Sequence, residues 1–143
     1  MLFIPAFLAP MPQSDSDPQG FTVWKSVVSR SAEQQIRWDR LREYPNHTVG
    51  VSYLRDDGAA EVHESEAEIY IVQAGEATLV VGGAIVQPKN AQPGEVWGSS
   101  IEGGQETSLR EGDIVHIGAN VPHQLKVAPG KNLIYTTIRV SSR

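Results

Sequence analysis

From about residue 47 onward, the chain alternates between short apolar-rich runs and clusters of turn-forming residues. Runs of this length and composition predict strands, and turn signals between them include Asp56-Asp57-Gly58, Gly75-Glu76 and Gly82-Gly83. The predicted strands cover residues 47–55, 59–63, 68–74, 77–81, 113–117, 124–127 and 133–140. Many short strands with little helix predict an all-β fold, either an antiparallel β-barrel or a double-stranded β-helix jelly roll.

Before these strands, the pattern predicts a short strand at 21–28 and one short helix at 29–42. Ser31 is the expected N-cap of this helix, with Gln34 three residues later as a weak capping box. The apolar face of the helix is modest, so we expect it to lie on the outside of the barrel. Residues 84–108 are rich in Pro and Gly and predict a long loop with one apolar run at 95–101, and whether this loop forms a lid is left open.

The domain organisation predicted from these patterns is an N-terminal arm or signal remnant at 1–20 and a barrel domain at 21–143. Residues 1–12 are apolar but contain no Lys or Arg and are interrupted by Pro5, Pro10 and Pro12. A membrane-spanning helix needs about 20 apolar residues, so we expect no membrane span here. The segment also lacks the basic start of a signal peptide, which leaves a cytoplasmic or a periplasmic or secreted location open.

Composition narrows the function classes without naming one. At 143 residues, 40% hydrophobic and 20% charged, the chain has the size and make-up of one ordinary globular domain. A formal net charge of −5 argues against nucleic-acid binding, because phosphate contacts need a basic face. The chain has no cysteine, which excludes a disulfide, a thiol nucleophile and an iron–sulfur ligand.

Residues 61–75 and 112–123 carry the candidate chemistry. Alternate side chains of a strand share a face, so Glu61 and His63 are expected to point the same way. Glu68 follows five residues after His63 on the next apolar run, and an antiparallel return would bring it back beside His63. His123 ends a second strand-turn unit and could add a ligand from the opposite side. Two imidazoles with one or two carboxylates suit a divalent metal ion.

Together these two stretches resemble the two sequence motifs of a small single-domain cupin. The matching residues are His63, Glu68 and Gly75 in the first stretch and Gly112, Asp113 and His123 in the second. The resemblance extends over roughly residues 49–140. It implies a cupin β-barrel that binds a metal ion and forms a homodimer by sheet-to-sheet packing.

Three features depart from the usual cupin pattern. The leading glycine of the first motif does not fall at its usual distance, although Gly58 is near. Glu61 stands where the family has its first His, so a carboxylate replaces an imidazole. The Pro-x-Gly turn of the second motif is replaced by Gly118-Ala119-Asn120, in which Gly and Asn can still adopt positive φ. We therefore expect the turn to be retained and the metal chemistry to differ from the family's commonest kind.

Glu61 has three possible roles. It could be one of a run of surface carboxylates, but its strand parity with His63 argues for an inward position. Two carboxylates inside a barrel are costly unless a cation or a proton neutralises one of them. We therefore favour Glu61 as a metal ligand together with His63, Glu68 and His123, and otherwise as the catalytic general base.

The remaining polar and aromatic residues are weaker candidates. Tyr70 and Gln124 are expected to line a substrate pocket, with core packing as the alternative for the tyrosine. His47 and His116 are not assigned as ligands, because His47 is at a strand start, where an exposed or capping role is commoner, and strand alternation does not settle which way His116 faces. The three tryptophans, Trp24, Trp38 and Trp97, are interpreted as core or subunit-interface residues rather than as substrate platforms.

The predicted cofactor is one divalent metal ion per chain, and mixed nitrogen and oxygen ligands suit Mn²⁺, Fe²⁺, Zn²⁺ or Ni²⁺. The first functional hypothesis is a metal-dependent isomerase, lyase or dioxygenase that acts on a small oxygenated molecule. The second is a cupin that binds a metal or small ligand without catalysis, and the third is a structural dimer with a vestigial site. The fold by itself does not choose among these hypotheses.

Overall fold

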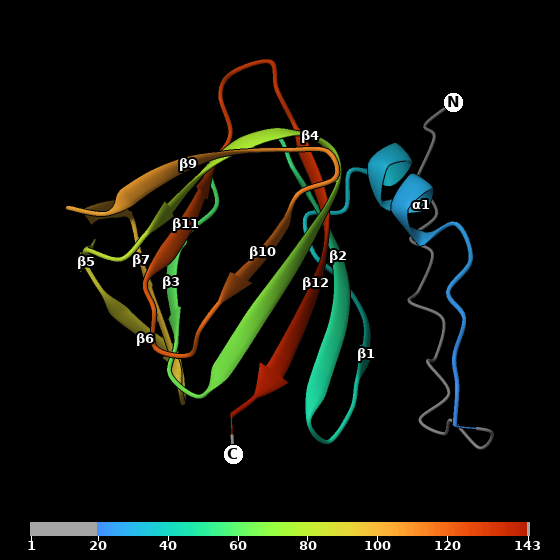
Figure 1. The fold of residues 1–143 in the computed structure, drawn as a ribbon, viewed down its shortest axis with the longest axis horizontal. Helices are drawn as coiled ribbons and strands as arrows, with labels where there is room; N and C mark the ends of the chain where they lie inside the picture. The colour runs from blue at the N-terminus through green and yellow to red at the C-terminus, as the bar shows by residue number, and fades with distance from the viewer. Residues whose placement is uncertain (1–19, 143) are drawn as a thin grey trace, which may run out of the picture.

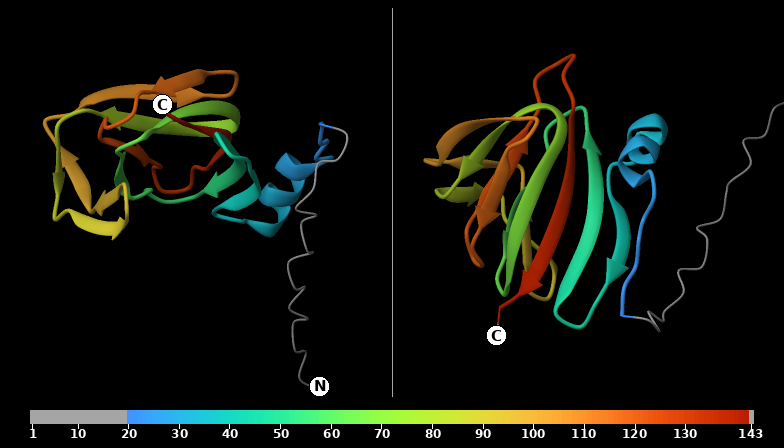
Figure 2. Two further views of the ribbon diagram at one scale, coloured as in Figure 1. Left: turned by 90° about the horizontal axis from the view of Figure 1, so that it is seen from below. Right: turned by 45° about the vertical axis from the view of Figure 1, so that its right-hand side comes forward.

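Antiparallel strands form one continuous sheet that curls until its two halves face each other, as Figures 1 and 2 show. The structure is a computed structural model and describes residues 20–142. The first half contains β1 (Asp39–Glu43), β2 (His47–Leu54), β12 (Leu133–Ser141), the start of β4 (Glu66–Val81) and β10 (Ile114–Ile117). The second half contains β6 (Lys89–Gln92), β7 (Glu95–Gly98), β3 (Ala60–His63), β11 (His123–Lys126), the end of β4 and β9 (Gln105–Arg110). This arrangement confirms the predicted all-β barrel of the jelly-roll type.

Strand β4 links the two halves, and the turn predicted at Gly75-Glu76 is wrong. The strand runs unbroken through both residues over its 16 positions. Gly75 has a φ of 81° and pairs with Leu133 of β12, and the register shift in this pairing lies two residues earlier, at Gln73, between Ile134 and Tyr135. A Cβ at Gly75 would overlap the carbonyl oxygen of Asn132. Gly75 is the last residue of β4 that pairs with β12, and from Glu76 onward the strand pairs with β9, so the positive φ falls where β4 passes from one half of the sheet into the other.

Helix α1 (Val27–Gln34) is shorter than the predicted helix at 29–42, and no strand forms at 21–28. The helix ends where Gln35 adopts a left-handed φ of 51°, and the rest of the predicted helix becomes β1 because it pairs with β2. Ser31 is buried within the helix instead of capping it, and Ser26 holds the N-cap position. The helix packs on the outside of the sheet, as expected, through Val27 and its apolar neighbours.

Residues 84–108 form strands rather than a long loop. They contain β6, β7 and most of β9, together with a two-stranded ribbon of β5 (Ala84–Val86) and β8 (Ser100–Glu102). Strand β7 pairs with β3, which places Glu95 opposite His63 and Trp97 opposite Glu61. This segment therefore builds a wall of the barrel next to the predicted metal ligands.

The interior of the barrel changes character along its length. A cluster of buried apolar side chains fills one part, with Val72, Leu79 and Leu133 among its members. Elsewhere the buried residues are polar or charged: His63, Glu68, Glu95 and His123. No helix in residues 20–142 is long and apolar enough to cross a membrane. The predicted arm at 1–20 lies outside the described residues, except for Gly20.

Candidate metal centre

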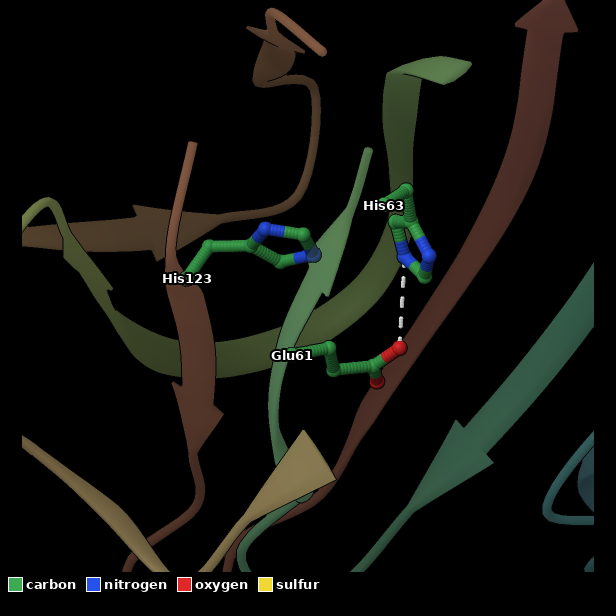
Figure 3. Close-up of side chains that lie close together, drawn as sticks. All are labelled: Glu61, His63 and His123. Carbon is green, nitrogen blue, oxygen red and sulfur yellow. Dashed lines mark ion pairs between the residues drawn. The ribbon is translucent and has the colours of Figure 1, made fainter. Parts of the chain in front are cut away.

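Three strands from the two facing halves of the sheet bring the four predicted ligands together. Glu61 and His63 lie on β3, Glu68 lies near the start of β4, and His123 begins β11. Glu61 and His123 are cross-strand partners, so their side chains lie side by side on one face of the sheet. Figure 3 shows Glu61, His63 and His123 pointing toward one another. Glu61 and His63 therefore point to the same side of β3, as their two-residue spacing predicts.

The donor atoms of these residues are close enough to share one ion. Oε2 of Glu68 lies 2.9 Å from Nε2 of His123 and 3.3 Å from Nε2 of His63. Oε2 of Glu61 lies 3.3 Å from Nε2 of His63, the contact drawn in Figure 3. Glu61, His63 and His123 each offer a ligand atom within 4.8 Å of the other two. Two ligand atoms about 2.1 Å from one metal ion and about 90–110° apart would lie roughly 3.0–3.4 Å from each other.

Both imidazoles are oriented by hydrogen bonds at their other ring nitrogen. Nδ1 of His63 lies 2.6 Å from Oε2 of Glu95, and Nδ1 of His123 lies 2.9 Å from the carbonyl oxygen of Val121. Both partners are acceptors, so each Nδ1 carries a hydrogen and donates it. Nε2 of each ring then faces the centre of the cluster, and both of these atoms are buried without a hydrogen-bond partner. This is the arrangement by which proteins orient metal-ligating histidines.

Glu68 is held in place on both of its oxygens. The hydroxyl of Tyr70 donates to Oε2 at 2.8 Å, and Nε of Arg139 donates to Oε1 at 2.8 Å. Arg139 lies directly across from Glu68 in the pairing of β12 with β4. The side chain of Glu68 is only 3% exposed, so these contacts replace the water that a carboxylate would otherwise require.

Arg139 and Glu95 belong to the site but were not predicted from the sequence. Nη1 of Arg139 donates to Oε1 of Glu95 at 3.3 Å, and its Nη2 lies 3.6 Å from Oε2 of Glu61. Arg139 thus contacts three carboxylates, those of Glu61, Glu68 and Glu95. No local pattern marks either residue, because each joins the cluster only through the pairing of distant strands.

The charges at this site shift the pKa values of its members strongly. Burial by itself lowers the pKa of His63, but the carboxylates of Glu61 and Glu68 outweigh it and raise this pKa to about 10. Burial would raise the pKa of Glu68, yet His123 and His63 hold it far below its usual range. Burial lowers the pKa of Arg139, and Glu68 and Glu61 more than compensate by raising it. The cluster therefore has a strong preference for positive charge at its centre.

A divalent cation fits this donor set. Three carboxylates and one guanidinium leave two negative charges uncompensated when both imidazoles are neutral. Two protons or one divalent ion would balance them, and the two buried Nε2 atoms without partners mark where such a cation would bind. Imidazole nitrogens with carboxylate oxygens and no sulfur are ligands for Zn²⁺, Fe²⁺, Mn²⁺ or Ni²⁺.

A cavity of about 510 Å³ opens beside the cluster. Glu61, Glu68, His123 and Arg139 contribute to its wall, and so does the predicted pocket residue Tyr70. The other predicted pocket residue, Gln124, is not part of this wall. The side-chain amide of Gln124 donates to the carbonyl oxygens of Gly58 at 2.9 Å and Ser99 at 3.4 Å, which connects β11 to its neighbouring segments. It alternates with His123 along the strand and therefore faces away from the cluster.

The two histidines that were not assigned as ligands lie apart from the cluster. His47 stacks on Tyr44 with ring centroids 4.5 Å apart, and its Nδ1 lies 2.7 Å from Oδ1 of Asn46. His116 is exposed on β10. Trp24 packs in the apolar cluster under α1, whereas Trp38 and Trp97 line the cavity instead of filling the core.

Comparisons with known proteins support the fold rather than an activity. No family model and no curated protein matches the sequence. A Bacillus halodurans protein of known crystal structure is similar with a TM-score of 0.64 at 14% identity, over 92% of this chain and 88% of that chain. An RmlC-like cupin family protein with a double-stranded β-helix fold from Methanocaldococcus jannaschii has a TM-score of 0.52 at 15% identity, over 73% and 78%.

The iron(II) form of HppE is also similar, with a TM-score of 0.53 at 17% identity, over 71% of this chain and 49% of that chain. At these identities the likeness establishes the fold alone. The curled antiparallel sheet and these neighbours agree on the same architecture. The described part of the chain therefore has the double-stranded β-helix fold of these neighbours.

Proposed function

We propose that this protein binds one divalent metal ion through His63, His123, Glu68 and Glu61, and that it is a metal-dependent enzyme acting on a small oxygenated molecule. The observation that carries the proposal is the pair of buried Nε2 atoms, on His63 and His123, that lack a hydrogen-bond partner. Both rings have an acceptor at Nδ1, so in the neutral imidazole each Nε2 has a lone pair directed into the cluster. Buried polar atoms rarely stay without a partner, and a metal ion would supply one to both.

The two proposed carboxylate ligands differ in how open they are to solvent. Glu68 is nearly fully buried and is fixed by Tyr70 and Arg139, which suits a permanent ligand. The side chain of Glu61 is 26% exposed and also lines the cavity, so it can reach a bound molecule. This position suits an exchangeable ligand that accepts a proton from the substrate at Oε1 or Oε2. The metal ion would act as a Lewis acid toward a substrate oxygen.

A cavity next to the cluster favours catalysis over storage of the metal. Its volume of about 510 Å³ is within the range for small-molecule sites. The proposed reaction is that of an isomerase, a lyase or a dioxygenase. The iron in the structurally similar HppE is a reason to include Fe²⁺ among the metals tested.

Elemental analysis of protein purified without chelator or nickel resin tests the metal proposal. We expect one transition metal ion per chain in the native protein and none in His63→Ala or His123→Ala. His116→Ala is the matched control, because it removes an exposed imidazole outside the cluster and should keep the metal. Full occupancy in His63→Ala would rule out the assigned site. A native protein that takes up no Mn²⁺, Fe²⁺, Zn²⁺ or Ni²⁺ would exclude metal-dependent catalysis.

Glu61→Gln separates the two roles proposed for Glu61. A ligand role predicts weaker metal affinity in this variant, because the amide loses the negative charge that balances the ion. A base role predicts unchanged metal affinity with loss of turnover of any substrate found by screening oxygenated small molecules. Metal binding without turnover across such a screen would favour the non-catalytic binding module over the enzyme.

We also expect the chain to form a homodimer by sheet-to-sheet packing, as the resemblance to small cupins implies. Light scattering coupled to size exclusion measures this directly. A mass of 15.6 kDa would indicate a monomer, and twice that value a dimer.

A further inference from the structure

Two tryptophans expose indole surface into the same cavity. Within residues 20–142 the exposed large hydrophobic residues are Phe21, Val23, Trp38, Trp97 and Ile114. Trp38 is 39% exposed and Trp97 is 46% exposed, and both line the cavity beside the metal cluster. Apolar surface left open to water inside a concave site is a feature of ligand binding.

The register of the sheet sets the position of Trp97. It lies opposite Glu61 in the pairing of β7 with β3, so both side chains stand next to each other on the inner face. Trp97 is therefore adjacent to the proposed metal ligand that is most open to the cavity. A molecule whose oxygen reached the ion beside Glu61 would bring its next atoms against this indole.

Trp38 lies just before β1, in the other half of the sheet. Its position is set by contacts with Gly50 and Arg139. Its ring lies over Gly50 of β2, where any Cβ would overlap the indole. The guanidinium carbon of Arg139 lies 5.8 Å from the centroid of the Trp38 ring, within the range of a cation–π contact. Trp38 is thus held between β2 and the charged cluster with part of its ring open to the cavity.

The wall of the cavity combines charged and apolar residues. Glu61, Glu68, His123 and Arg139 belong to the metal cluster, and Arg37 and Arg40 also line the wall. Apolar surface comes from the buried side chains of Leu54 and Leu125 and from the two indoles. A ligand that matches this wall has an oxygen donor group for the metal centre and an apolar body in contact with the indoles.

We propose that the cavity selects aromatic ligands: a flat ring bound against Trp38 and Trp97, with an attached oxygen donor group directed at the metal centre. This inference rests on the proposed metal site for the position of the oxygen group. Aromatic rings prefer offset-stacked or edge-to-face contacts with one another, so two indoles on different parts of the wall favour a planar ring over an aliphatic chain. The class includes phenols, catechols and aromatic hydroxy acids.

Three hydroxamates that share one chelating group and differ only in the attached body test the inference. Benzohydroxamate has a flat ring, cyclohexanecarbohydroxamate a ring of similar size that is not planar, and acetohydroxamate a single methyl group. Their affinities for the Zn²⁺-loaded full chain are measured by calorimetry. We expect benzohydroxamate to bind at least about tenfold more tightly than acetohydroxamate and about threefold more tightly than the cyclohexane compound.

Trp97→Ala locates the source of this preference, with Phe21→Ala as the matched control. Both variants remove an exposed aromatic side chain, but Phe21 is not part of the cavity wall. We expect Trp97→Ala to reduce the preference for benzohydroxamate over acetohydroxamate at least about threefold, and Phe21→Ala to leave it unchanged. Zinc content measured for each variant confirms that the metal site is intact.

The outcomes separate the two proposals. Equal affinities for the three hydroxamates, or a preference that survives in Trp97→Ala, would overturn the aromatic inference while leaving the metal site standing. A zinc-loaded protein that binds none of the three compounds would overturn it as well. A chain that binds no Zn²⁺ would refute the metal site itself, and the aromatic inference would fail with it.

Discussion

Arg139 and Glu68 face each other across β12 and β4, and Nε of Arg139 donates to Oε1 of Glu68 at 2.8 Å. The same guanidinium also contacts Glu95 and Glu61. One cation therefore organises three carboxylates, of which Glu68 and Glu61 are proposed ligands and Glu95 orients His63. The cluster still carries excess negative charge, which a bound divalent ion would balance.

Replacing Arg139 by Met should strongly destabilise the metal-free protein, because it leaves Glu68 and Glu95 buried without their cation. We expect the free energy of unfolding in urea to fall by about 3 kcal/mol, toward the lower end for breaking a buried ion pair because the guanidinium is partly exposed. Added Zn²⁺ should recover part of this loss, since it supplies positive charge to the same carboxylates.

Arg30→Met is the control for this variant. It breaks the ion pair of Arg30 with Asp39, in which the arginine side chain is 46% exposed. Exposed pairs contribute little, so the loss should be below about 1 kcal/mol. Equal losses in the two variants would contradict the central role assigned to Arg139.

The metal-free protein should lose stability as the pH rises from neutral to alkaline. The pKa of His63 is raised from 6.5 to about 10 in the folded protein, so protonated His63 stabilises the fold fully below about pH 6.5. This contribution declines between about pH 6.5 and 10, where the folded state keeps a proton that the unfolded state has already released, and it is lost above pH 10. Urea unfolding with a chelator at several pH values in this window measures the decline.

His63→Gln separates this effect from the titration of other groups. The glutamine side chain does not titrate, so the free energy of unfolding of this variant should depend less on pH over the same window. The comparison is between the free energies of unfolding of the native protein and of His63→Gln. If the native value stayed constant or rose across this window relative to the variant, the raised pKa of His63 would be contradicted.

Glu95→Gln should weaken metal binding without removing a ligand. Glu95 accepts the hydrogen of Nδ1 of His63 at 2.6 Å, and its negative charge makes the opposite nitrogen a better donor to a metal. Loss of such a partner lowers metal affinity about 10–100-fold, which competition with a chelator of known affinity can measure. Glu106→Gln, an exposed site on β9, should leave the affinity unchanged. An unaltered affinity in Glu95→Gln would exclude this role.

Gly50→Ala should move Trp38 without replacing it. The added methyl group would overlap the indole, and because Trp38 is partly exposed the ring can shift outward at a cost of about 1 kcal/mol. We expect the tryptophan emission to move to longer wavelength and the preference for benzohydroxamate to decrease. At Gly118, where the nearest atom to a new Cβ is Cγ2 of Val121 at 3.8 Å, alanine should change neither property. An unchanged emission spectrum in Gly50→Ala would show that the Trp38 ring does not pack against Gly50.

Several features of the fold could be predicted because they depend on neighbours in sequence. The placement of Glu61 and His63 on one face follows from the two-residue period of a strand. The role of Gly75 was harder to predict, because positive φ at glycine occurs both in hairpin turns and within irregular strands. Only the pairing of β4 with β12 up to Gly75, and with β9 from Glu76 onward, shows that the strand continues through it. The helix was predicted too long for a similar reason, since β1 forms by pairing with β2.

The sequence by itself determined the all-β architecture and the four residues proposed as metal ligands, since both follow from local alternation, turn residues and motif spacing. Only the tertiary structure brought Glu95 to His63, 32 residues away, and Arg139 to Glu68, 71 residues away. It also placed Trp38 and Trp97 on the wall of one cavity and turned Gln124 away from it. The physical reason is that strand register over such distances depends on how the whole sheet packs, and a shift of one residue would reverse the face of every side chain involved.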